Sequence, residues 1–212
     1  MPEAIRCKVP PNESLLICNA LCEFSDETFV YILPNNNPNP DDKVDFYYGP
    51  FLIGPKLIPL KNKLQITYEI NNPQLGIYKY DVYNKEWNFV DNQFDKDGIK
   101  ATIKSGGIFS IIKDEVPPSI QKPVPQIGST YRRDHFNLIQ FYIDDISSGI
   151  RDDTNIKVFL DNHQIIVEYN PYRKLVYYEL ENPLHIGNHQ IRIEVIDNSK
   201  NKSSINGTFY IK

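Results

Sequence analysis

Four histidines are the first side chains that could bind a metal or move a proton: His135, His163, His185 and His189. His185 and His189 have the four-residue spacing of a zinc-binding pair on a helix. Gly187 and Asn188 lie between them and favour a turn, and no glutamate stands inside the motif to act as a base. We therefore expect a hairpin turn here, with metal binding as the alternative.

Acidic residues supply a second set of candidate ligands: Asp41-Asp42, Asp144-Asp145, Asp152-Asp153 and Asp197. Calcium binds several oxygens that converge from loops. The loops at 144–145 and 197–201 could meet at one end of a sandwich, although no known ligand spacing is complete. We expect solvated loop charges, and calcium at Asp144, Asp145 and Asp197 is the alternative. Since no four-ligand set exists, we expect no zinc.

Nucleophilic catalysis needs a hydroxyl or thiol next to a base that a third group orients. Ser147-Ser148-Gly149 is typical of a loop, and the chain has neither Gly-x-Ser-x-Gly nor a glycine loop that cradles phosphate. A carboxylate pair for sugar hydrolysis is defined by distance in space, which sequence does not give. We expect no catalytic residue and no cofactor.

Aromatic side chains cluster on both sides of one predicted turn: Tyr78, Tyr80, Tyr83, Trp87 and Phe89. Tyr78 and Tyr80 share one strand face, as do Trp87 and Phe89. Cross-strand aromatic pairs stabilise a hairpin by about 0.2–1 kcal/mol each. We expect these residues to pack in the core, and a carbohydrate-binding face is the alternative.

The three cysteines, Cys7, Cys18 and Cys22, cannot all pair within one chain. No histidine pair completes a zinc set with Cys18 and Cys22. We expect buried free thiols; one disulfide and a metal site are the alternatives.

Composition restricts the class of protein. The 212 residues are 41% hydrophobic and 24% charged, a globular balance. A net charge of -4 disfavours nucleic acid as a partner. No apolar run reaches the roughly 18 residues that cross a bilayer. Residues 1–11 do not have the pattern of a secretory signal, so we expect either a cytosolic protein or a signal in an upstream part.

Apolar and polar residues alternate along several segments, which predicts β-strands. The alternation is clearest at 64–70, 99–104, 156–160 and 191–195, and it is typical of antiparallel sheets with one face in a core. Turn residues recur every 8–12 positions, as in a sandwich or barrel. They include Lys96-Asp97-Gly98 and Asn206-Gly207, the latter before a strand at 208–211. The segment 15–24 is the nearest approach to a helix, but a short turn or strand suits it equally.

Asp114-Glu115-Val116-Pro117-Pro118 divides these strands into two blocks. Consecutive prolines favour a stiff, extended link. The sequence therefore predicts an all-β protein of two tandem antiparallel β-sandwiches, with domains at 1–113 and 119–212 and a linker at 114–118. Asn35 to Pro40, rich in Asn and Pro, is predicted to be an irregular loop.

Three motifs of the first block have a familiar pattern: Tyr78-Lys79-Tyr80-Asp81, Trp87-Asn88-Phe89-Val90 and Gly107-Ile108-Phe109. With these motifs the block resembles the end of β-sandwich modules in large bacterial surface and secreted proteins, and it is similar to the sandwich module of ankyrins and netrin receptors.

The second block resembles bacterial immunoglobulin-like or fibronectin-like domains. The resemblance lies in residues 143–150, 158–162, 187–191 and 197–201. Paired modules of this kind often follow zinc endopeptidases of the lysostaphin type, whose His-x-x-x-Asp and His-x-His motifs are absent here.

These resemblances imply a non-catalytic module pair of a bacterial surface or secreted protein. We expect it to be extracellular and to position a partner or an upstream catalytic domain. The alternative is an adhesion module that binds a glycan or a surface protein. An enzyme is the third hypothesis. A pocket lined by two or more aromatics with converging polar groups favours the binding module.

Overall fold

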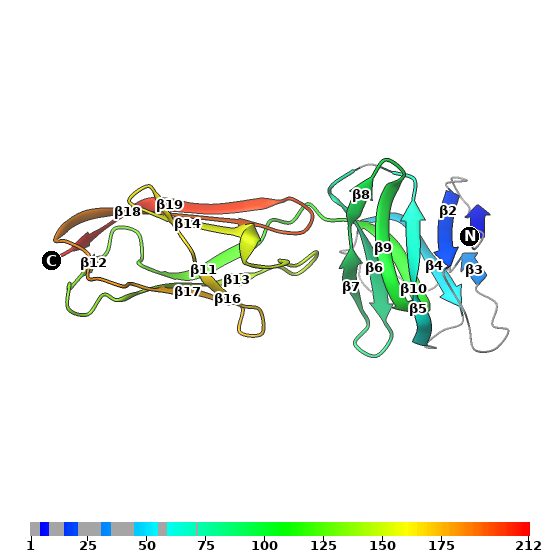
Figure 1. Ribbon diagram of the computed structural model, residues 1–212, viewed down its shortest axis with the longest axis horizontal. Coiled ribbons are helices and arrows are strands. Elements are labelled where there is room, and N and C mark those ends of the chain that lie inside the picture. Colours follow the sequence, from blue (N-terminus) through cyan, green and yellow to red (C-terminus); the bar gives the residue numbers. More distant parts are fainter. Residues whose placement is uncertain (1–4, 9–14, 21–30, 35–44, 55–58, 71) are drawn as a thin grey trace. The chain divides into compact units, whose positions relative to one another are not determined.

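The computed structural model describes residues 5–8, 15–20, 31–34, 45–54, 59–70 and 72–212. The chain divides into two compact units, Met1–Glu115 and Val116–Lys212 (Figure 1). Helical structure in the described ranges is limited to a single 3-10 turn, η1 (Asp153–Asn155). The all-β class predicted from the alternation is therefore confirmed.

The first unit is a sandwich of two five-stranded sheets. One sheet has the order β1 (Ile5–Lys8), β2 (Leu15–Ala20), β5 (Pro59–Tyr68), β9 (Gly98–Ser105) and β8 (Gln93–Asp95). The other has the order β3 (Tyr31–Pro34), β4 (Asp45–Gly54), β10 (Gly107–Lys113), β6 (Leu75–Asp81) and β7 (Glu86–Asp91). Every pairing in both sheets is antiparallel.

The core of the first unit lies between these sheets. The apolar positions of β5 and β9 that alternate in sequence face it, and β4, β6 and β10 complete it from the other layer. Ile66, Phe51 and Phe109 are each 0% exposed. Burial of a side chain of this size stabilises the fold by about 1.5–3 kcal/mol, so the alternation directly selects the strand register.

The second unit packs a four-stranded sheet against a five-stranded one. The first has the order β11 (Ser119–Val124), β13 (Leu138–Asp144), β17 (Leu175–Glu179) and β16 (Glu168–Asn170). The second has the order β12 (Thr130–Tyr131), β19 (Lys202–Ile211), β18 (Gly187–Ile196), β14 (Ile156–Leu160) and β15 (His163–Ile165). The short β12 runs parallel to β19, and the other pairings are antiparallel.

One predicted turn is wrong. Asn206 and Gly207 lie inside β19, opposite Arg192 and Ile191 of β18, and the reversal occurs at 197–201 instead. A Cβ added at Gly207 would lie 2.5 Å from Cγ2 of Ile127. The glycine therefore allows close approach of another segment and does not mark a turn.

The segment considered as a helix contains a strand, β2. Asn35 to Pro40 and Cys22 lie outside the described residues, as do the side chains of Cys7 and Cys18, so the predictions for them stay predictions. Among the described residues no helix is long and apolar enough to cross a membrane.

Candidate ligand-binding site

A cavity of about 460 Å³ opens at the hairpin that joins β6 to β7. Pockets for small ligands usually measure about 300–1,000 Å³ and combine apolar walls with a few polar groups. Eight residues line this one: Lys79, Tyr80, Asp81, Val82, Tyr83, Asn88, Gly107 and Ile108. All belong to β6, β7, β10 or the hairpin loop, so one continuous piece of sheet forms the site.

Asp81 shapes the tip of the hairpin. Its Oδ1 accepts the backbone N–H groups of Tyr83 at 2.8 Å and Asn84 at 3.2 Å, and its Oδ2 accepts from the Asn84 amide at 2.9 Å. These bonds lower the pKa of Asp81, the Asn84 N–H contributing most and the Tyr83 N–H next. The carboxylate thus closes an Asx turn.

The closed turn presents two large apolar side chains at the cavity. Val82 is 61% exposed and Tyr83 is 86% exposed, although both line the same space. Lys85 ends the loop in the left-handed region, with φ of 58°. Exposed apolar side chains beside a cavity are typical of interaction sites.

Lys79 supplies the cationic group of the cavity. On β6 it pairs with Asn88 of β7 on one side and with Phe109 of β10 on the other. Its Nζ lies 5.6 Å from the centroid of the Phe109 ring and donates a 2.6 Å hydrogen bond to Ser105 Oγ. Burial lowers the pKa of the Lys79 ammonium, because desolvation penalises the charged form.

Gly107 leaves room for the Lys79 side chain. A Cβ added at this glycine would lie only 2.6 Å from Cε of Lys79. Any larger residue at 107 would therefore displace the lysine, so the position of the ammonium depends on the glycine.

Two of the five clustered aromatics, Tyr78 and Tyr80, are buried as predicted, and their partners Phe89 and Trp87 are partly buried. Tyr78 meets Phe89 edge-on at 5.4 Å between ring centroids, and Tyr80 meets Trp87 at 5.2 Å. Tyr78 and Tyr80 are 2% and 8% exposed. Tyr83 is the exception, since it stands in solvent at the cavity mouth.

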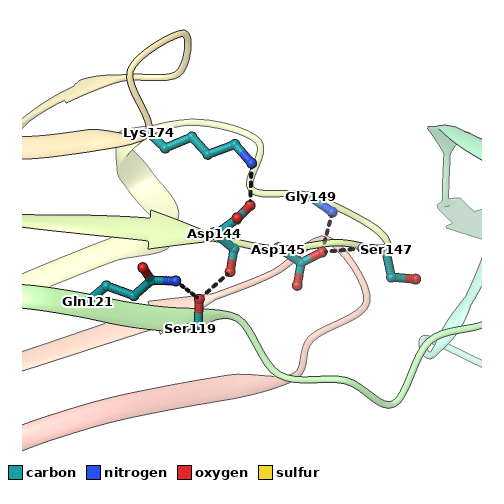
Figure 2. Close-up of polar contacts among 7 residues, drawn as sticks. All are labelled: Ser119, Gln121, Asp144, Asp145, Ser147, Gly149 and Lys174. Carbon is teal, nitrogen blue, oxygen red and sulfur yellow. Dashed lines mark hydrogen bonds and ion pairs between the residues drawn. The ribbon is translucent and has the colours of Figure 1, made fainter.

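The acidic residues at one end of the second unit separate into two roles (Figure 2). The Asp144 side chain forms an ion pair with Lys174, and its carbonyl accepts from Ser119 Oγ at 3.2 Å. Asp145 turns toward the following loop, where its Oδ1 accepts the N–H groups of Ser147 at 3.0 Å and Gly149 at 2.7 Å. The serine-rich segment is thus a loop, as predicted.

Asp197 differs from the prediction of a solvated charge, because it is 0% exposed. Its two oxygens accept from the N–H and the side-chain amide of Asn201, at 2.8 and 2.9 Å. Asp145 and Asp197 bring one carboxylate oxygen each within 4.8 Å of one another. Calcium at Asp145 and Asp197 stays a prediction.

The histidines do not form a metal site. His189 is buried in β18; its Nδ1 lies 2.6 Å from Asp161 Oδ2 and its Nε2 lies 2.8 Å from the His185 carbonyl oxygen. Both ring nitrogens therefore have partners, and neither is directed to a metal. Gly187 and Asn188 begin β18 after an irregular segment and pair with β19, so the hairpin turn expected between His185 and His189 is wrong and the two histidines do not share a helix either.

The sequence identified Tyr80 and Tyr83 as candidate ligand-binding residues. It did not identify Lys79, Asn88 and Gly107 as residues of a site. One signal was available: Leu75, Ile77 and Lys79 alternate on one face, and the lysine occupies a position where the pattern calls for an apolar residue. A charge at a core-facing position near a strand end indicates either a buried pair or a site.

No protein-family model matches this chain, and no curated protein matches it. The resemblances to the ankyrin and netrin-receptor sandwich and to immunoglobulin-like or fibronectin-like domains therefore stay predictions.

Two solved structures are similar over most of the chain, both described as the extracellular domain of a regulatory system from B. thetaiotaomicron. The one-component form has 11% identity and a TM-score of 0.32, covering 99% of this chain and 30% of that one. The hybrid two-component form has 11% identity and a TM-score of 0.31, covering 96% and 36%. The chain thus spans about a third of their length, and at these scores the likeness supports no argument about function.

Proposed function

We propose that this chain is a non-catalytic pair of β-sandwich modules that binds a glycan at the β6–β7 hairpin. The observation that carries the proposal is the cavity of about 460 Å³, which combines Tyr80 and Tyr83 with the polar side chains of Lys79, Asp81 and Asn88.

A sugar matches this lining. Its ring has an apolar face that packs on an aromatic side chain, and Tyr83 stands exposed at the cavity for that contact. Its hydroxyl groups both donate and accept hydrogen bonds, as the Asn88 amide does. The Asx turn holds Tyr83 in place, which reduces the ordering cost of binding.

The proposal assigns no turnover to the cavity. Hydrolysis of a glycosidic bond by the common mechanism needs two carboxyl groups across the bond. Asp81 is the only carboxylate among the lining residues, and its oxygens already accept the N–H groups of the loop. A recognition role suits this lining better.

The proposal also includes the location of the protein and its positioning role. We place the chain outside the cell, at a surface or in a secreted protein, where it would hold a partner domain against a glycan. The sequence resemblance of both blocks to surface-protein modules supports this placement. The Pro117-Pro118 link between two separately packed cores also favours a positioning role.

A matched pair of variants tests the glycan site. Tyr172 occupies the same place as Tyr83 in a four-residue loop, between β16 and β17, and is 99% exposed. We expect the wild-type chain to retain at least one saccharide on a glycan array. We expect Tyr83→Ala to weaken that binding about tenfold, as for a central aromatic contact, and Tyr172→Ala to leave it unchanged.

Two outcomes would contradict the proposal: no saccharide bound by the wild-type chain, or equal losses in the two variants. Release of reducing sugar from a bound saccharide, abolished by a single substitution at the cavity, would show an enzyme instead.

A further inference from the structure

The polar group that distinguishes this cavity is the Lys79 ammonium. Among the described residues no carboxylate forms an ion pair with it; its polar contacts are the Ser105 hydroxyl at 2.6 Å and the face of the Phe109 ring. An ammonium that is partly removed from water and has no counter-ion favours a bound anion. The ammonium carries three N–H donors, and Ser105 accepts one.

The other charged group of the lining does not neutralise Lys79. Asp81 is two residues away on β6, and its oxygens accept the Tyr83 and Asn84 N–H groups at the hairpin tip. Burial lowers the pKa of the Lys79 ammonium, and no ion pair between Lys79 and Asp81 forms among the described residues. The cavity therefore has the Lys79 ammonium at one end, and at the hairpin tip it has the exposed Val82 and Tyr83 side chains beside the hydrogen-bonded Asp81 carboxylate.

We propose that the cavity is specific for acidic saccharides, whose sugar carboxylate pairs with Lys79 while the ring packs against Tyr83. This inference rests on the proposed glycan site and narrows its ligand class to uronic acids and related carboxylate sugars. Charge complementarity selects the acid over a neutral sugar of the same shape, since a neutral ligand would leave the ammonium without a counter-ion.

The structure also explains how the lysine is held. The ammonium lies over the Phe109 ring and donates a hydrogen bond to Ser105 Oγ, and Gly107 leaves space for the methylene chain of the lysine. These three contacts come from β9 and β10, and none of them needs the ligand. Pre-positioning of this kind lowers the free-energy cost of binding.

The test compares each acidic saccharide with its own methyl ester, because esterification removes the charge and keeps the sugar. Oligosaccharides of galacturonate, alginate and hyaluronan, each as acid and as methyl ester, are titrated into the full chain by calorimetry. We expect at least one acid to bind about tenfold or more tightly than its ester, and added salt to weaken the acid alone.

Substitutions then assign the preference to Lys79. Lys79→Met should remove the difference between acid and ester, while Lys79→Arg should keep most of it. Lys100→Met is the matched control: it removes the same charge from the same unit, at a residue paired with Asp95 and Asp97 outside the cavity. This control should retain the preference.

The outcomes separate this inference from the glycan site itself. Binding of neutral saccharides or esters as tight as the acids, unaffected by Lys79→Met, would overturn the acidic preference and leave the site intact. Absence of any saccharide binding would overturn both proposals.

Discussion

Single aspartates in this protein form a turn and also bind a neighbouring strand through their side chain. Asp161 illustrates this in the second unit. It forms the β14–β15 turn with Asn162, both with positive φ of 49° and 67°, and its carboxylate accepts the Gln190 N–H at 2.8 Å. Its other oxygen meets His189, so one side chain ties the turn to β18.

The His189 contact predicts a stability effect. His189→Ala should lower the free energy of unfolding of the second unit by about 2–4 kcal/mol, because it removes a buried ring and leaves the His185 carbonyl without its partner. Chemical denaturation followed by near-ultraviolet circular dichroism would measure this. His135→Ala, at an exposed histidine, is the control and should change stability by less than about 0.5 kcal/mol. Equal effects of the two variants would refute the structural role.

At the scale of elements, the alternation of apolar and polar residues predicted the strands well. It did not predict the function of Gly207 or the residues of the cavity. Leu64, Ile66 and Tyr68 all face the core, as their period of two requires. The role of Gly207 depends on Ile127, far away in the chain, and local sequence carries no such information. The same holds for the cavity, since Gly107 and Asn88 become neighbours of Lys79 only through strand register.

The two four-residue hairpin loops also share a strained position. Lys85 and Lys174 end their loops at φ of 58° and 53°, a region that costs a non-glycine residue about 1 kcal/mol or more. Lys85→Gly should therefore raise the stability of the first unit by about 0.5–1 kcal/mol. Thermal unfolding by calorimetry would measure the gain.

Lys96 provides the comparison for this substitution. It lies in the turn between β8 and β9 and has no positive φ. Lys96→Gly should destabilise the unit or leave it unchanged. A similar gain from both substitutions would mean that strain at Lys85 is not the cause.

At the scale of the whole molecule, each unit has its own hydrophobic core, and among the residues that the structure describes each core draws its side chains from one unit. We therefore predict that residues 1–115 and 116–212 each fold when produced separately, with a single cooperative transition. Denaturation of both fragments and of the full chain tests this. If neither fragment folds alone, the division of the chain into independent modules is wrong.

The central claim is that a glycan binds at the β6–β7 hairpin of the first unit. Backbone amide NMR of the full chain, titrated with the saccharide that binds best, locates the contact directly. We predict that the largest shift changes fall on residues 79–83, 88, 107 and 108, with the second unit nearly unaffected. Shift changes concentrated in the second unit, or scattered without relation to the cavity, would contradict this claim.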